Sequence, residues 1–200
     1  MRLIIVRHGE TQWNQVQRLQ GASQTQLTTR GQWQARQIAA RLRRMQVDTV
    51  ISSPLQRCKD TATPIAKSGH HPLYLDAALA EMHFGCWEGK TFDEIAAEHP
   101  EQFALWRQHP DQMRASTDAE TVPEVWARVA GLLDELLAQG DDKCHVLVTH
   151  TVPAKLIIAS AIALPLSNIH AIRLDNASMS MVDWRQEQKV LRLMNDISHL

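Results

Sequence analysis

Two short apolar segments, each followed by a histidine, constrain the fold of this chain more than any other feature. Residues 3–6 (LIIV) precede Arg7 and His8. Residues 146–149 (VLVT) precede His150. Continuous apolar runs are typical of strands buried on both faces, whereas a half-exposed strand alternates apolar and polar residues. Open parallel sheets bind ligands at the carboxyl ends of their strands, so this pattern predicts an α/β fold with two histidines at that edge.

Helices are predicted between and after these strands. Apolar residues recur near helical spacing in residues 27–45, where Thr28 is the predicted N-cap. Residues 121–137 begin with a capping box (TVPE) and carry a broad apolar face. Residues 52–67 are predicted to be a loop that turns into a helix, which Pro64 should kink or shorten.

Further strands are predicted at residues 47–52 and 71–75. Residues 169–193 are predicted to form two or three strands, with a hairpin turn at residues 185–189 (RQEQK). Strands that alternate with helices in this order predict a three-layer α/β/α sandwich around a mostly parallel central sheet.

The chain length suits one compact domain with a full hydrophobic core, so residues 1–200 are predicted to form a single domain. Helical patches broken by Pro100 and Pro110 predict a small helical cap insertion at approximately residues 80–120. In the same region Trp87 and Trp106 are candidates for lining a pocket, whereas the other tryptophans considered are expected in the core: Trp33, Trp126 and Trp184.

The formal net charge of −1 gives no sign of a surface for nucleic acid or a membrane, so any anion must be bound by local side chains. The absence of a secretion signal and of any apolar run of about 18 residues predicts a soluble, cytoplasmic protein. Cys58, Cys86 and Cys144 are too few and too widely spaced for a disulfide framework or a metal site, and we expect them to be buried.

Four scattered side chains indicate phosphate chemistry, provided that the sheet brings them together: Arg7, His8, Arg57 and His150. A guanidinium offers a planar fork of donors that matches phosphate oxygens, and a neutral imidazole held beside it can attack phosphorus. Two nearby arginines would also oppose protonation of His8 and keep it nucleophilic.

Four motifs, which occur in order over most of the chain, resemble the histidine phosphatase superfamily, which includes phosphoglycerate mutases. They are RHGETQWN at residues 7–14, SSPLQR at 52–57, EMHFGCWEG at 81–89 and VTH at 148–150. A lone RHG triplet would be a weak signal, but the four motifs together are specific.

The resemblance implies a role for each matching residue. His8 would accept the phosphoryl group and form a transient phosphohistidine. Arg7, Arg57 and His150 would hold the non-bridging oxygens. Glu81 would protonate the leaving oxygen and then activate water. Asn14 would add a donor from the loop, and neither a metal nor another cofactor is implied.

Two departures from the family pattern affect further phosphate-binding candidates. Thr151 follows His150 where the family usually has glycine, although its backbone N–H could still reach phosphate. The loop that begins at Gln20, another candidate, reads QGASQTQLT instead of the common QGxxDSPLT.

Weaker alternatives remain open for individual residues. Glu81 has neighbouring carboxylates that could serve as the acid, namely Glu88, Asp76 and Glu94. The remaining histidines have no HExxH or paired spacing, which favours surface or core positions over metal ligation.

The predicted function is hydrolysis of a small phosphomonoester by a monomer or homodimer. The segments at residues 79–88, 172–176 and 181–183 are similar to bacterial α-ribazole-5′-phosphate phosphatases of cobalamin synthesis, which makes α-ribazole 5′-phosphate the predicted substrate. The alternatives are a broad-specificity sugar phosphatase, a phosphoserine phosphatase, a phosphoglycerate mutase, or a phosphate-binding regulator without turnover.

Overall fold

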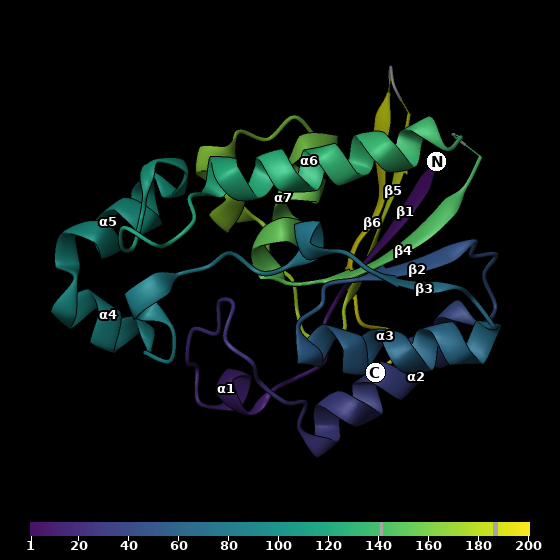
Figure 1. Cartoon of the computed structure of the whole chain (residues 1–200), viewed down its shortest axis with the longest axis horizontal. Helices are drawn as coiled ribbons and strands as arrows, with labels where there is room; N and C mark the ends of the chain where they lie inside the picture. Colours follow the sequence, from purple (N-terminus) through teal and green to yellow (C-terminus); the bar gives the residue numbers. More distant parts are fainter. Residues whose placement is uncertain (141, 186–187) are drawn as a thin grey trace.

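The computed structural model describes residues 1–140, 142–185 and 188–200, and its centre is a six-stranded sheet (Figure 1). The strand order is β3-β2-β4-β1-β5-β6. The four strands from β3 to β1 are parallel, and they comprise β1 (Arg2–Arg7), β2 (Thr49–Ser52), β3 (Leu73–Leu75) and β4 (Cys144–Thr149). The predicted α/β fold with a mostly parallel sheet is therefore confirmed.

Helices cover both faces of this sheet, which explains why its central strands are apolar throughout. Ile4 and Val6 of β1 pack in one core with α2 (Thr29–Leu42) and α3 (Gln56–Gly69). Leu3 and Ile5 point to the opposite face and pack in a second core, which includes α6 (Val122–Ala138) and α7 (Thr151–Ala161). Successive strand residues face opposite sides, so burial of both faces requires a continuous apolar run.

The C-terminal part of the chain forms two strands. β5 (Met179–Trp184) pairs antiparallel with β1, and β6 (Lys189–Asp196) pairs antiparallel with β5. Residues 169–171, at the start of the region predicted to form strands, belong instead to a 3₁₀ helix (Leu166–Ala171). The predicted hairpin turn includes residues 186–187, which lie outside the described residues.

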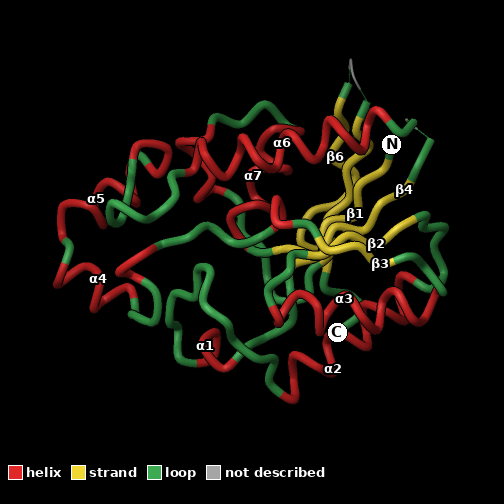
Figure 2. Tube along the Cα trace, in the orientation of Figure 1, coloured by secondary structure: helices red, strands yellow, loops and turns green. Residues whose placement is uncertain are grey.

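A largely helical segment between β3 and α6 lies beyond the carboxyl ends of the parallel strands (Figures 1 and 2). It contains α4 (Phe92–Glu98), α5 (Pro100–Gln108) and short 3₁₀ turns, and it buries Trp87 and Trp106. The single-domain assignment with a cap insertion at approximately residues 80–120 stays a prediction. None of the helices among the described residues is long and apolar enough to cross a membrane.

Local predictions succeeded or failed according to packing. Thr28 caps α2 and Thr121 forms a capping box with Glu124 of α6, as predicted. Of the two effects predicted for Pro64, shortening of the helix is wrong, because α3 continues to Gly69 and packs against α2 and the sheet. The predicted kink stays a prediction.

Side-chain burial also differs from prediction at particular positions. Trp33 is 40% exposed on α2, so its assignment to the core is wrong. Cys58 and Cys144 are buried as expected, whereas Cys86 is exposed in a 3₁₀ turn of the segment between β3 and α6. The periodic pattern identified the helix but did not decide which edge residues of its apolar face are covered.

Candidate active site

His8 follows β1 directly and is held in one tautomer by its own loop. Its Nδ1 lies 2.7 Å from the Gly9 carbonyl oxygen, which can only accept, so Nδ1 carries the proton and Nε2 keeps a free lone pair. The ring is 2% exposed. Burial, followed by the charges of Arg57 and Arg7, holds the pKa of His8 well below its usual 6.5. His8 is therefore a neutral imidazole with one unprotonated nitrogen.

The backbone turn after His8 requires glycine. A Cβ atom at Gly9 would lie 2.6 Å from the backbone oxygen of Gly31, which is far closer than a carbon can approach. The Gly9 N–H donates to Thr61 Oγ1 at 3.0 Å, so α3 fixes this turn. Close packing of two backbones thus sets the position of the His8 ring.

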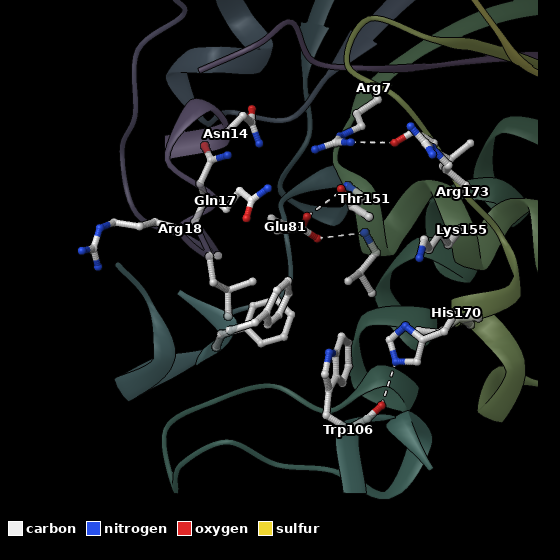
Figure 3. Close-up of a pocket in the computed structure, with 18 of the residues that line it drawn as sticks. Arg7, Asn14, Gln17, Arg18, Glu81, Trp106, Thr151, Lys155, His170 and Arg173 are labelled. Atoms are coloured by element: carbon white, nitrogen blue, oxygen red, sulfur yellow. Dashed lines mark hydrogen bonds between the residues drawn. The ribbon is translucent and has the colours of Figure 1, made fainter. Parts of the chain in front are cut away.

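The Arg7 guanidinium has N–H groups that are not hydrogen-bonded to any described residue of the protein. Its Nη1 donates to the Leu174 carbonyl at 2.6 Å, which orients the guanidinium toward the cavity (Figure 3). Among the described residues its buried Nε has no hydrogen-bond partner. A buried donor without an acceptor is costly in an empty site, and an anion beside the guanidinium would satisfy it.

Arg57, near the start of α3, is oriented by backbone carbonyls of the loop after α1. Its Nη2 donates to Gly21 O at 2.7 Å and its Nη1 to Ser23 O at 2.8 Å. That loop is tied down in turn by Glu88, whose carboxylate accepts from the amides of Ala22 and Ser23, both at 2.9 Å. The position of Arg57 therefore depends on a loop that a remote carboxylate anchors.

His150 follows β4 and lies beside His8, with 5.2 Å between the ring centroids. Arg57 Nε donates to its Nδ1 at 3.1 Å, so Nε2 carries the proton and lies 2.8 Å from Ser53 Oγ. Burial and the charge of Arg57 hold the pKa of His150 well below 6.5. Both ring nitrogens already have partners, and within the described chain His150 is not among the residues that line the cavity.

Glu81 is bound at the N-terminus of α7. Its Oε2 accepts from the Thr151 amide at 3.0 Å, and its Oε1 accepts from the Val152 amide at 3.1 Å (Figure 3). Burial raises the pKa of Glu81, although the amides of Met82 and Val152 and the charges of Arg57 and Arg7 oppose the rise. A carboxyl with a raised pKa at the edge of a cavity is suited to donate a proton.

Of the four carboxylates weighed from the sequence, Glu81 lines the cavity and the other three do not. Glu88 anchors the loop described above. Asp76 accepts from the Ala78 amide, and Glu94 forms a capping box in α4. The motif at residues 81–89 favours Glu81 over the other three, and the position of Glu81 in the cavity wall agrees with that choice.

The residues predicted to bind phosphate around the loop differ in whether their hydrogen-bond donors already have partners in the protein. Asn14 Oδ1 accepts from Thr11 N at 3.0 Å and from Asn176 Nδ2 at 3.1 Å, which leaves the Asn14 amide hydrogens for the cavity (Figure 3). Gln20 also lines the cavity, and its Oε1 accepts from Thr25 Oγ1 at 2.6 Å. The Thr151 N–H is already occupied by Glu81.

Asn176 is a site residue that the sequence did not single out. Its Nδ2 donates to the His8 carbonyl at 3.2 Å as well as to Asn14 Oδ1, so it connects the turn at His8 to the loop helix α1 (Gln12–Gln15). No periodicity or motif connects two residues 168 positions apart, so only the fold reveals this contact.

The cavity has a volume of about 920 Å³ and two unlike walls. One wall is aromatic and is formed by Phe84, Phe92, Phe103 and Trp106. Trp106 was predicted to line a pocket and does so, whereas Trp87 is fully buried and is not among the lining residues described. The other wall carries cations from α7 and the segment after it, chiefly Lys155 and Arg173.

The described residues contain no group of three or more histidine, cysteine, aspartate or glutamate side chains placed to hold a metal ion. The two buried cysteines lie outside the cavity lining, although Cys58 Sγ is 3.3 Å from His150 Nε2. Burial raises the pKa of Cys58, so its thiol stays protonated beside that ring.

Known proteins resemble this chain over its whole length. Residues 3–197 match the model of the histidine phosphatase superfamily, branch 1. Phosphoserine phosphatase 1 of Hydrogenobacter thermophilus is 32% identical, over 100% of this chain and 94% of its own length. A probable phosphoglycerate mutase GpmB of an Enterobacter species is also 32% identical, over 100% of this chain and 95% of its own length.

A solved structure, the α-ribazole phosphatase from Shigella flexneri, has a TM-score of 0.87 at 30% identity and covers 98% of this chain and 96% of its own. Three relatives whose names give different substrates thus have comparable identity to this chain. The chain therefore belongs to the histidine phosphatase superfamily, branch 1, and is an enzyme of the phosphatase and mutase kind that acts on a small phosphorylated metabolite.

Proposed function

We propose that this enzyme hydrolyses phosphomonoesters through a phosphohistidine on His8. The lone pair of His8 Nε2 attacks phosphorus, and the bond from phosphorus to the ester oxygen breaks. Glu81 gives its proton to that oxygen, so the alcohol leaves neutral. Glu81, now a carboxylate, takes a proton from water, whose oxygen then displaces His8 and releases inorganic phosphate.

The observation that carries the proposal is the 2.7 Å contact between His8 Nδ1 and the Gly9 carbonyl oxygen. The carbonyl of Gly9 commits Nδ1 to donation, so Nε2 is left as a nucleophile beside Arg7 and Arg57. The two guanidinium groups both oppose protonation of the ring and supply positive charge for the phosphoryl oxygens. Arg7, Arg57 and Asn14 have the free donors that suit this task, while His150 orients Arg57 through the 3.1 Å contact with its Nε.

The 32% identity to phosphoserine phosphatase 1 of Hydrogenobacter thermophilus supports hydrolysis, and the equal identity to a probable phosphoglycerate mutase keeps phosphoryl retention as the alternative. A regulator that only bound phosphate would need neither a nucleophile nor a proton donor. The presence of both His8 and Glu81 at one cavity therefore supports turnover.

The first test of the mechanism is capture of the intermediate. Protein mixed with p-nitrophenyl phosphate and quenched in base should carry one phosphoryl group that survives alkali and is lost in acid, as phosphohistidine is. The His8→Ala variant should carry none. A base-stable phosphoryl group on that variant, or loss of phosphatase activity after dialysis against a chelator, would contradict the proposal.

For the substrate, the sequence predicts α-ribazole 5′-phosphate. The aromatic wall supports this prediction, because a benzimidazole could stack on Trp106 or Phe103. The likeness to the Shigella flexneri structure supports it as well. The second candidate is a phosphomonoester that carries an acidic group, such as phosphoserine, which the cationic wall and the 32% identity to a phosphoserine phosphatase support.

The two candidates separate in one panel of phosphate-release measurements. The panel contains α-ribazole 5′-phosphate, phosphoserine, 3-phosphoglycerate and several sugar phosphates, with His8→Ala as the blank. A kcat/KM for α-ribazole 5′-phosphate about a hundredfold above the rest, equivalent to about 2.7 kcal/mol, would support the cobalamin assignment. A flat profile would keep the mechanism and remove that assignment.

A further inference from the structure

Lys155 is a cation in the cavity wall that the phosphoryl-transfer steps do not use. It lies on α7, one turn after Thr151, and its side chain points into the cavity between Arg7 and His170 (Figure 3). Residues four apart on a helix share a face, so the turn that presents amides to Glu81 also presents this ammonium to the same cavity.

Two other cations of the cavity lining are paired with carboxylates. Arg18 pairs with Glu94 at 2.8 Å, and Arg173 pairs with Asp175 at 3.0 Å. Within the described chain, the Lys155 ammonium takes part in no hydrogen bond or ion pair, and burial is the main cause that lowers its pKa. A partly buried ammonium without an acceptor is unfavourable in the empty site, and a bound anion would remove that cost.

Lys155 has charged neighbours on the phosphate side of the cavity and His170 on its other side (Figure 3). The charges of Arg7 and Glu81 contribute to the pKa shift of the Lys155 ammonium. The charge of Lys155 in turn contributes to the lowered pKa of His170 on its other side. His170 donates through Nε2 to the Trp106 carbonyl at 2.7 Å and so belongs to the aromatic wall. Lys155 therefore lies between the phosphate end of the cavity, marked by Arg7 and Glu81, and the wall that would contact the rest of the substrate.

We propose that Lys155 binds a second acidic group of the substrate, a carboxylate or a second phosphate, on the part of the molecule that departs with the ester oxygen. This inference rests on the proposed function, because it assigns the leaving alcohol to the side of Glu81 and Lys155. It makes Lys155 a specificity-determining residue. It also favours the acidic candidate substrate, since α-ribazole 5′-phosphate has no second acidic group.

Matched substrates test the inference directly. The pair 3-phosphoglycerate and glycerol 3-phosphate differs by a carboxylate in place of a hydroxymethyl group. The pair fructose 1,6-bisphosphate and fructose 6-phosphate differs by a second phosphate. We expect wild-type kcat/KM to be at least tenfold higher for the acidic member of one pair, and that pair identifies which acidic group is bound.

Variants of Lys155 should change this selectivity and little else. Lys155→Met should lower kcat/KM for the preferred acidic substrate at least tenfold, mainly through KM, and for its neutral partner less than threefold. Lys155→Arg should keep most of the selectivity. Lys67→Met, at an exposed position on α3 outside the cavity, is the matched control, and melting curves check that each variant is folded.

The failure of this inference can be told apart from failure of the proposed function. Equal rates within both substrate pairs, or a uniform loss across all substrates in Lys155→Met, would overturn the inference while His8-dependent hydrolysis of p-nitrophenyl phosphate persisted. Uniform loss would place Lys155 on the transferred phosphoryl group. Absence of His8-dependent hydrolysis would overturn the proposed function itself.

Discussion

The two ends of the cavity are built by different means. At the proposed phosphate end, backbone groups hold the candidate catalytic side chains: the Gly9 carbonyl orients His8, loop carbonyls orient Arg57, and the first amides of α7 bind Glu81. At the substrate end, the wall consists of side chains such as Phe92 and Lys155. Substitution at the substrate end therefore leaves the backbone that positions the nucleophile unchanged, whereas the phosphate end depends on a particular chain path.

This difference suggests that the chemistry is common to the family and that specificity depends on the wall. A main-chain carbonyl or amide stays in place when its own side chain is replaced, so the phosphate end tolerates substitutions that keep its chain path, which Gly9 and Glu88 maintain. The aromatic and cationic side chains can be exchanged one at a time. Relatives with different named substrates at about 32% identity are in accord with this division.

The largest expected effect is at the nucleophile. His8→Ala removes the atom that would form the covalent bond, and we expect kcat/KM to fall by about a thousandfold or more on every substrate. Initial rates of phosphate release measure this loss. His109→Ala, at an exposed position of the segment between β3 and α6, is the matched control. A rate within tenfold of wild type would assign the attack to another group.

The next effect depends on the leaving group. Glu81→Gln keeps an acceptor for the α7 amides but cannot donate a proton, so alkyl phosphates should lose about 10²–10⁴ in kcat. p-Nitrophenyl phosphate, whose leaving group needs no proton, should lose less than tenfold. Glu135→Gln, on the exposed side of α6, is the control. If Glu81→Gln hydrolysed alkyl phosphates like wild type, the acid would be another carboxylate, with Glu88 the first to examine.

The same pair of residues sets the pH dependence. Protonation inactivates His8, whose lowered pKa places the acidic limb of kcat/KM below pH 6.5. Loss of its proton inactivates Glu81 as the general acid. The pKa of Glu81 is raised above 4.5, so the rate falls as the pH rises through this raised pKa. For an alkyl phosphate we therefore expect a bell-shaped profile whose alkaline limb disappears in Glu81→Gln. An alkaline limb that the variant retained would belong to another group.

The smallest effect is expected for Glu88, which anchors the loop whose carbonyls orient Arg57. Glu88→Gln weakens the charge-assisted contacts with the Ala22 and Ser23 amides, which should lower the free energy of unfolding by about 1–3 kcal/mol. Because the carbonyls of that loop orient Arg57, kcat/KM should also fall several-fold on all substrates alike. Urea denaturation and a two-substrate rate comparison measure both. A change in substrate selectivity would mean that Glu88 acts on the wall instead.

Most of the fold could be predicted from local pattern. The apolar runs at residues 3–6 and 146–148 require a sheet buried on both faces, and capping at Thr28 and Thr121 marks where helices begin. Those signals involve neighbouring residues, so they can be recognised without knowing which distant segments pack against them. The exposure of Trp33 could not be predicted, because it depends on how α2 is rotated against the sheet.

The candidate site was predictable only where a motif marks it. Arg7, His8, Arg57 and Glu81 line one cavity, and all four stand in motifs that the sequence displays. Lys155 stands in none, although its spacing of four residues from Thr151 is a signal that could have placed it on the same helix face. The aromatic wall was only partly predicted, since Trp106 lines the cavity and Trp87 is buried beneath it.

The sequence by itself determined the order of strands and helices and indicated the candidate reactive side chains, because apolar periodicity, capping and motif residues are properties of neighbouring positions. The tertiary structure alone decided which hydrogen bonds those side chains make. His8 and Asn176 are 168 residues apart, and Glu81 reaches the amides of residues 151–152 across 70 positions. Contacts at such separation arise from the packing of the sheet and its helices, and no local pattern encodes them.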